Sequence, residues 1–221
     1  MKKFLGIASV LALALILGVG SAMADSITYT LDNPNPGLSG FTGPYATVDI
    51  DRTSSTAATI TFTSLTTNGI TFLMGSDAAG MNVAGTFSLG TITPSFLPGF
   101  NGTFSDGGSG NMDGFGTFNL RISDSCGYPC AASKLVFTLN ATGGTTWGSA
   151  SGILTPNSQG ALVAFHGFAC TSPCTVADGA LSTGFAANGG AVNTPEPGSV
   201  LLLGSEWSAV GLWGRRKQLL A

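Results

Sequence analysis

The chain has 221 residues, of which only 9% are charged and 33 are glycine. Between residues 25 and 194, three basic side chains stand against nine acidic ones. Nucleic-acid binding depends on basic residues that neutralise phosphates, so this sparsely charged, mildly acidic composition excludes a nucleic-acid partner.

Residues 1–24 have the order of a secretory signal peptide. Two lysines open the chain, an apolar run follows over 4–19, and Ala22 and Ala24 are the small residues that signal peptidase requires. We therefore predict a signal-peptide helix, export by the Sec machinery and cleavage after Ala24. The alternative is a buried N-terminal helix. Cleavage would leave a mature chain that begins at Asp25.

Residues 25–185 are predicted to form one all-β domain, an antiparallel β-sandwich. Short runs alternate β-branched or aromatic residues with Thr or Ser, and Gly- and Asn-rich turns separate them. This pattern favours a sandwich over alternating strands and helices. A short helix is expected within 145–156. The expected strands are 45–51, 57–65, 69–74, 85–93, 116–123, 134–140 and 161–168.

The C-terminal part of the chain divides into a linker and an apolar tail. Residues 186–194 are small and polar, which predicts a flexible linker. The apolar run 200–214 would span about 22 Å as a helix, against roughly 30 Å of hydrocarbon. Glu206, near its centre, costs about 2.5–3.5 kcal/mol on insertion scales and roughly cancels the gain from the Leu and Val residues. A short, marginal transmembrane helix is expected; the alternative is an apolar helix packed on the body.

The cluster of Arg215, Arg216 and Lys217 follows this run directly. With the body exported, these cations belong on the cytoplasmic side and act as stop-transfer residues. The expected topology therefore places the body outside the inner membrane, the tail across it and the cations inside.

The order of these elements resembles the PEP-CTERM sorting signal, in which a Pro-Glu-Pro motif precedes a short transmembrane helix and an Arg-rich end. The resemblance covers 195–217, and 218–221 remain as a tail. It implies that Pro195, Glu196 and Pro197 are recognised by an exosortase, a membrane-embedded cysteine protease or transpeptidase. It also implies transient anchoring in the inner membrane, then release to the cell surface or biofilm matrix of a bacterium that makes extracellular polysaccharide.

Four cysteines occur as two close pairs, "CGYPC" and "CTSPC". An even number of cysteines in an exported chain predicts disulfides, and each short Pro-containing turn can bring its own two cysteines together. Other connectivities, and a four-thiolate zinc site, are the alternatives. The local pairing would join Cys126 with Cys130 and Cys170 with Cys174.

The sequence contains few other candidates for chemistry. His166 is the single histidine and lies on an expected strand, where a packed, hydrogen-bonded ring is favoured over a general base. The Gly-rich loop with Asp106, Asn111 and Asp113 offers oxygen ligands for Ca²⁺, although plain turns have the same composition. We therefore predict no catalytic residue, no metal site and no cofactor, with calcium as the minor alternative.

These features together predict a non-catalytic, exported surface or matrix protein that an exosortase-like protease sorts. The alternative is a carbohydrate-binding module that acts on extracellular polysaccharide. In that case Tyr45, Tyr128 or Trp147 would stack on sugar rings, and Trp147 is the best single candidate.

Overall fold

The computed structural model describes residues 25–194, and this part of the chain is all-β. The predicted signal peptide (1–24), the predicted sorting signal (195–217) and the tail 218–221 lie outside the described residues, as do both predicted flanking helices. Among the described residues no helix is long and apolar enough to cross a membrane. Two short 3₁₀ helices occur, η1 (Tyr128–Cys130) and η2 (Ser151–Ile153). The strands are β1 (Asp25–Pro34), β2 (Ala46–Ser54), β3 (Ala57–Ser64), β4 (Thr66–Thr67), β5 (Ile70–Met81), β6 (Phe87–Ser95), β7 (Ser105–Asp106), β8 (Gly110–Met112), β9 (Gly116–Phe118), β10 (Leu120–Ser123), β11 (Lys134–Ala141), β12 (Val163–Thr171) and β13 (Ser182–Thr194).

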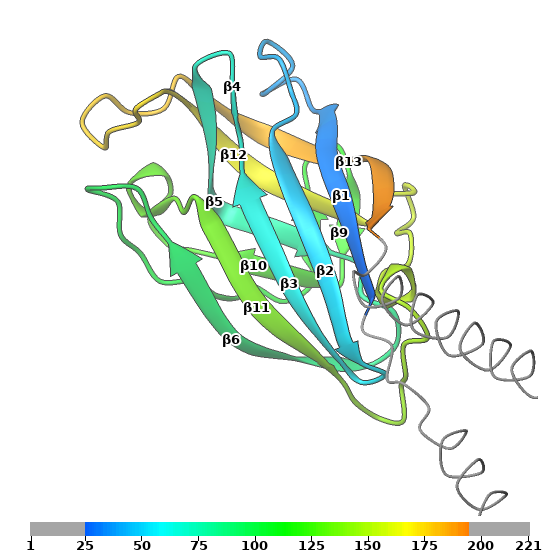
Figure 1. Cartoon of the computed structure of the whole chain (residues 1–221). Helices are drawn as coiled ribbons and strands as arrows, with labels where there is room; N and C mark the ends of the chain where they lie inside the picture. Colours follow the sequence, from blue (N-terminus) through cyan, green and yellow to red (C-terminus); the bar gives the residue numbers. More distant parts are fainter. Residues whose placement is uncertain (1–24, 195–221) are drawn as a thin grey trace, which may run out of the picture.

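The main strands form one continuous antiparallel sheet in the order β6-β11-β3-β2-β1-β13-β12-β5-β10-β7. β4 pairs with β5, and β8 and β9 form a separate hairpin. The sheet curls on itself, so its front half (β6, β11, β3, β2 and β1) covers its back half (β13, β12, β5, β10 and β7) (Figure 1). The prediction of an all-β, antiparallel body is confirmed. Instead of the two separate sheets expected of a sandwich, one hydrogen-bonded path runs through both halves.

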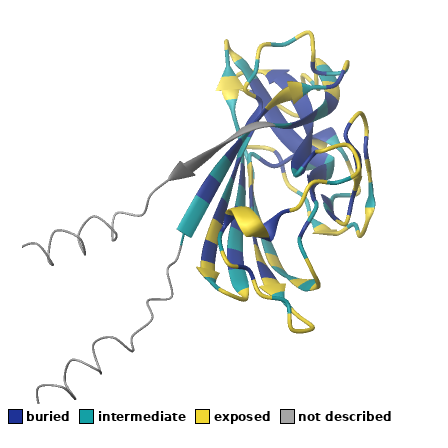
Figure 2. Ribbon diagram, turned by 90° about the vertical axis from the view of Figure 1, so that its right-hand side faces the viewer, coloured by how far each residue is buried: buried dark blue, intermediate teal, exposed yellow. Residues whose placement is uncertain are grey.

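The front half has one buried and one exposed face. Along β3, Ala58, Ile60 and Phe62 are buried, while Thr59, Thr61 and Thr63 point to the other side, as the alternation predicts. Figure 2 shows the resulting bands of buried and exposed residues. Because successive side chains of a strand point to opposite faces, this half contributes its inner face to the main core and leaves a hydroxyl-rich outer face.

The centre of the back half, β12 and most of β5, is buried on both faces. Every residue of β12 from Val163 to Cys170 is buried. The main core covers one face. Two smaller clusters, centred on Phe168 and Phe118, cover the other face with residues from segments outside the main strands. The back half therefore resembles the middle layer of a three-layer structure, and its polar side chains need partners inside the protein.

β1 and β13 are strands that the sequence analysis did not list. In β1, Ile27, Tyr29 and Leu31 are buried, and the strand pairs with β2 and β13. The prediction of a flexible linker over 186–194 is wrong, because these residues form the second half of β13. Small side chains do not prevent strand formation here, since the backbone pairs with β1 throughout this range and Ala186 and Ala187 are buried. The domain therefore extends to Thr194 instead of ending at 185.

Three further expectations change in detail. The strand expected over 69–74 continues as β5 to Met81, past a wide bulge in which four residues (75–78) oppose His166 alone. The strand expected over 116–123 is divided at Asn119, whose side chain bonds both the N–H and the C=O of Val83 at 2.8 Å. The short helix expected within 145–156 is reduced to the single 3₁₀ turn η2.

Candidate functional site

The described part of the chain contains an open pocket of about 190 Å³ beside β1 and β13. Three side-chain amides line it, those of Asn33, Gln159 and Asn188. The apolar part of the lining comes from buried Phe115, Ala161 and Ala187, and Gly114 and Gly160 complete it. We call this site the amide pocket. None of its lining side chains carries a charge.

Two bulges in the β1–β13 ladder bring Asn33 and Asn188 to the pocket. The register shifts between Thr30 and Leu31 and again between Leu31 and Asn33. A bulge turns the following side chain out of regular alternation, and bulges are common beside functional sites. The Asn188 Oδ1 atom accepts hydrogen bonds from the N–H groups of Leu162 and Val163, at 3.0 and 3.2 Å. Its amide is therefore fixed in orientation, with the Nδ2 group left over.

Asn157 builds the loop that carries Gln159. Its Oδ1 accepts from the N–H groups of Gln159 and Ala161, both at 3.0 Å, and its Nδ2 donates to the Phe115 carbonyl at 2.8 Å. Gly116 has φ of +82°, and a Cβ there would lie 3.1 Å from the Gln159 side chain. This glycine therefore lets Gln159 lie close against the opposite wall of the pocket.

Asn35 supports the part of the pocket wall that follows Asp113 in the chain. Its Nδ2 donates to the Asp113 carboxylate at 3.2 Å, and its Oδ1 accepts from the N–H groups of Gly37 and Phe185, at 3.1 and 3.0 Å. Asn35 and Asn157 thus use their amides to build the structure. Within residues 25–194, by contrast, the side-chain amides of Asn33 and Gln159 and the Nδ2 of Asn188 make no hydrogen bond, so they remain available at the pocket surface.

His166 lies on β12 and is buried, as predicted for a packed strand histidine. Its Nδ1 lies 2.8 Å from the Gly75 carbonyl, which can only accept, so Nδ1 carries the proton. Its Nε2 lies 2.6 Å from the Thr183 hydroxyl, which donates to it. The ring stacks on Phe185 with centroids 4.4 Å apart and also touches Phe168. We call this arrangement the histidine site.

Burial lowers the pKa of His166, while its bond to the Gly75 carbonyl and the nearby Asp77 and Asp124 carboxylates partly oppose that change. A neutral imidazole matches the hydrogen-bond pattern. Because both ring nitrogens have partners, neither is free to take a proton from a substrate. His166 has no serine bonded to its ring, so a Ser-His-Asp arrangement is not formed at this residue.

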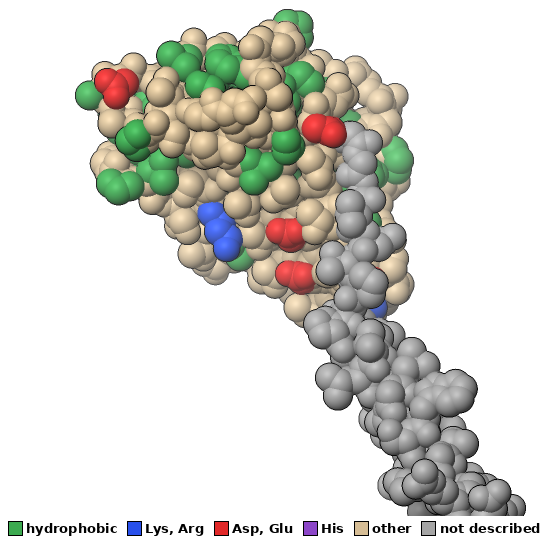
Figure 3. All heavy atoms as spheres, turned by 45° about the horizontal axis from the view of Figure 1, so that its top comes forward, with side chains coloured by type: hydrophobic (Ala, Val, Ile, Leu, Met, Phe, Trp, Pro, Cys, Tyr) green, Lys and Arg blue, Asp and Glu red, His purple; other side chains and the backbone are tan. Residues whose placement is uncertain are grey.

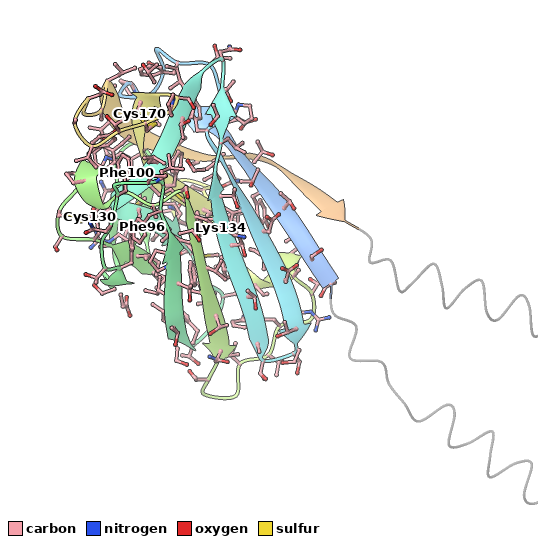
Figure 4. The ribbon with its side chains drawn as sticks, turned by 60° about the vertical axis from the view of Figure 1, so that its left-hand side comes forward. Phe96, Phe100, Cys130, Lys134 and Cys170 are labelled. Atoms are coloured by element: carbon pink, nitrogen blue, oxygen red, sulfur yellow. A yellow bond between two sulfur atoms is a disulfide. The ribbon has the colours of Figure 1, made fainter. Side chains whose placement is uncertain are left out.

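The cysteines form the two local disulfides that the spacing predicts. Cys126 is joined to Cys130, and Cys170 to Cys174, with Cα–Cα distances of 5.6 and 5.5 Å. Figure 4 shows Cys130, Cys170, Phe96 and Phe100 on the same flank of the molecule. The alternative of a zinc site fails in this structure, because thiols joined as disulfides cannot ligate zinc as thiolates.

Tyr128 connects the two disulfide loops. Its hydroxyl donates to the Thr175 carbonyl at 3.0 Å, and its ring packs edge-on against Phe100 and Phe168. One aromatic ring of η1 thus joins the first disulfide turn to the second. The flank is a structural cluster, and Tyr128 is buried within it.

The other metal candidates also have structural partners. The one group of three His, Cys, Asp or Glu ligand atoms in residues 25–194 is Asp124 with Cys126 and Cys130, and both thiols are oxidised. Asp124 Oδ1 accepts from the N–H groups of Cys126 and Gly127, both at 2.8 Å.

The carboxylates of the loop predicted to bind Ca²⁺ also have hydrogen-bond partners within the protein. Asp106 accepts from the N–H of Gly108 at 2.8 Å, and Asp113 accepts from Asn35. Asn111 lies in the β8–β9 hairpin opposite Thr117. Asp106 thus lies at the end of β7, Asn111 in β8 and Asp113 in the turn of the β8–β9 hairpin, and both carboxylates already accept hydrogen bonds within the protein.

The three aromatic residues expected to stack on sugars are all buried. Tyr45 and Trp147 are each 2% exposed and Tyr128 is 9% exposed. The Trp147 Nε1 donates to the Ala84 carbonyl at 3.0 Å, and the Tyr45 hydroxyl to the Phe41 carbonyl at 2.8 Å. Their aromatic faces belong to the core, so the prediction that they bind sugar is wrong.

Fold and site together define an all-β, disulfide-containing domain whose open polar site is lined by neutral amides. Comparisons of the chain with protein-family models, curated proteins and solved structures found no match. The sequence analysis missed Asn33, Gln159 and Asn188. Single Asn and Gln residues carry no motif, and only the double bulge and the loop 157–161 bring them together.

Proposed function

We propose that the protein is an exported, non-catalytic surface or matrix protein that an exosortase-like protease sorts through Pro195, Glu196 and Pro197. The observation that carries the proposal is the pair of local disulfides. Stable disulfides are characteristic of proteins outside the cytoplasm, which agrees with the signal-peptide pattern of residues 1–24.

The two ends of the described chain support this orientation. β1 begins at Asp25, the residue expected to follow the signal-peptide cut, and Ser26 pairs with Thr194 (Figure 1). A chain held in the inner membrane through residues after 194 would therefore have its mature N-terminus at the same end of the domain. The loops at the opposite end would face away from the membrane.

The surface also suits a neutral matrix. Figure 3 shows charged side chains as isolated spots between neutral areas. With three basic against nine acidic side chains in residues 25–194, the charge of the body is sparse and mainly negative, so it does not attract an anionic polymer. The histidine site has no free proton acceptor on its ring, which favours a non-catalytic role for the body.

The test is mass spectrometry of the protein isolated from exporting cells. We expect an N-terminal peptide that starts at Asp25 and a C-terminal peptide that ends near 195–197, without Arg215–Lys217. The Glu196→Gln variant, which alters the motif, is expected to accumulate uncut in the inner membrane. The matched variant Glu206→Gln removes the charge from the apolar run and is expected to be cut at least as well as the natural chain. An intact C-terminus in the natural protein would contradict sorting by cleavage.

A second candidate, binding to extracellular polysaccharide, is favoured by one specific observation. The amide pocket is open, neutral and lined by hydrogen-bonding groups that the fold does not use. This candidate does not depend on Tyr45, Tyr128 or Trp147, which are in the core. It requires only that the exported body meets sugar polymers outside the cell.

A further inference from the structure

We infer that the amide pocket binds a single neutral sugar unit, hydrogen-bonded by Asn33, Gln159 and Asn188. The inference rests on the second candidate function and specifies its site and ligand class. It is independent of whether the tail is cut.

The chemistry of the lining excludes most other ligand classes. No Lys, Arg or His lines the pocket, so a phosphate, sulfate or carboxylate would lose its water without gaining a cation. No Asp or Glu lines the pocket either, so a charged amine would lose its water without gaining an anion. A neutral ligand with many polar groups meets neither penalty.

The remaining groups match a sugar ring. Each amide offers a donor and an acceptor, and a hydroxyl can do both, so neighbouring hydroxyls can pair with one amide. Phe115, Ala161 and Ala187 are buried beneath the pocket and leave little apolar area, so hydrogen bonds would supply most of the recognition. The volume of about 190 Å³ is below the roughly 300–1,000 Å³ typical of pockets for drug-sized ligands. One ring, with its chain continuing into solvent, fits this description best.

Part of the pocket is prepared for binding before a ligand arrives. The Asn188 Oδ1 is fixed by two backbone N–H groups, and Asn157 closes the loop that carries Gln159. Groups already held in place lose little conformational entropy when a ligand binds. This advantage applies to the Asn188 amide and to the backbone of the loop that carries Gln159, whereas the exposed Asn33 and Gln159 side chains would be ordered by the ligand.

A peptide is a poorer fit than a sugar. Peptides commonly bind sheets by adding a strand to a free edge. The strands beside the pocket, β1 and β13, are interior strands, since β1 lies between β2 and β13 and β13 between β1 and β12. At the pocket, Asn33 pairs with Ala187 and Asn188 with Leu31 in the β1–β13 ladder, and the side-chain amides supply further polar groups for a ligand.

The position of the pocket suits a polymer outside the cell. Asn33 is eight residues along β1 from Asp25, which corresponds to about 27 Å of extended strand. A body held near its termini would therefore present the pocket well away from the attachment point. A long polysaccharide could reach it without contacting the membrane.

The test measures binding of neutral disaccharides to the exported, mature protein by saturation-transfer NMR. The probes are cellobiose, maltose, lactose and chitobiose, with digalacturonate as the acidic comparison. We expect at least one neutral disaccharide to bind and digalacturonate not to bind.

Three variants assign binding to the pocket. Asn33→Ala and Gln159→Ala each remove one amide and are expected to weaken binding about five- to tenfold, the effect of roughly one lost hydrogen bond. Asn188→Asp keeps Oδ1 for Leu162 and Val163 but removes the Nδ2 donor, and is expected to weaken binding by at least as much. The matched control, Asn140→Ala at an exposed position of β11, is expected to bind like the natural protein.

The outcomes separate the site from the function. Binding of a neutral disaccharide that the three pocket variants leave unchanged would overturn the pocket assignment while preserving carbohydrate binding. Failure of every neutral probe to bind would overturn both. Preferred binding of digalacturonate would contradict the argument from the uncharged lining. The thermal unfolding temperature of each variant is measured alongside. The binding result for Asn188→Asp is interpreted only if this variant unfolds at the same temperature as the natural protein.

Discussion

The histidine site and the amide pocket share strand β13, with the first reaching β12 and the second β1, and they use their polar groups in opposite ways. At the histidine site, both ring nitrogens of His166 are bonded and two phenyl rings cover its faces. At the pocket, Asn33, Gln159 and Asn188 keep hydrogen-bonding groups at an open surface. His166, which has the more reactive side chain, therefore has a structural role. The three amides, which are chemically unreactive, are available to bind a ligand.

Position in the sheet explains the difference. His166 lies in the middle of a strand that is buried on both faces, opposite the bulge of β5. A polar group there must be paired internally, because an unpaired one costs about 1–3 kcal/mol. The pocket lies where the β1–β13 ladder is irregular and a loop approaches, so side chains can face water. The following predictions test this contrast.

The largest effect is expected from His166→Ala. The change leaves the Gly75 carbonyl without its donor and opens a space between Phe168 and Phe185. We expect the free energy of unfolding to fall by roughly 2–4 kcal/mol, measured by urea denaturation. Sugar binding per folded molecule should not change. A variant as stable as the natural protein would contradict a structural role for His166.

Asn157→Ala tests the division between amides that build and amides that bind. It removes the acceptor for Gln159 and Ala161 and the donor to Phe115, so a loss of about 1–3 kcal/mol is expected. Gln159→Ala, two residues away, is expected to change stability by no more than about 0.5 kcal/mol. Equal destabilisation by both variants would remove the distinction between the two kinds of amide.

The lowered pKa of His166 predicts a pH dependence. The unfolded chain takes up the histidine proton near the ordinary pKa of about 6.5, while the folded protein takes it up only at lower pH. The stabilising contribution is therefore complete above about pH 6.5 and declines as the pH falls through the folded pKa. In urea denaturation between pH 7 and 5, His166→Gln should have a shallower decline than the natural protein. If the free energy of unfolding of His166→Gln declined with pH as steeply as that of the natural protein, other groups would be the cause of the decline.

The smallest effect is expected on the front half, where Asp51 lies on the exposed face of β2. Partial desolvation and the Asp49 carboxylate raise the pKa of Asp51. A raised carboxyl pKa contributes stability below the unfolded pKa of about 4, and this is lost as the pH rises through the folded value. Asp51→Asn should therefore raise the melting temperature slightly at pH 7 and have less effect at pH 3. A lower melting temperature at pH 7 would mean that Asp51 makes a stabilising contact when charged.

The strands of the front half could be predicted well, because one face is buried and the period of two is visible in the sequence. Thr59, Ile60, Thr61 and Phe62 lie as their alternation predicts. β1 has the same alternation in Ile27, Tyr29 and Leu31 and was open to the same reasoning. β13 was harder, because Ala, Gly and Asn in 186–194 resemble a linker and only pairing with β1 makes them a strand.

The disulfide pairs and the packed histidine could be predicted from spacing and context. The buried state of Trp147 and the composition of the pocket could not. Trp147 is surrounded by Gly and Thr in sequence, which is typical of a loop, yet it packs in the main core. The pocket depends on residues from four distant segments and on two bulges, and local patterns do not encode either.

The most direct test of the contrast between the two sites is a titration of the isotopically labelled mature protein with the neutral disaccharide that binds best, followed by NMR of the side-chain signals. The account predicts that the amide NH₂ signals of Asn33, Gln159 and Asn188 shift together, while the His166 ring signals stay in place. Shifts centred on His166 and Thr183, with the three pocket amides unchanged, would contradict it.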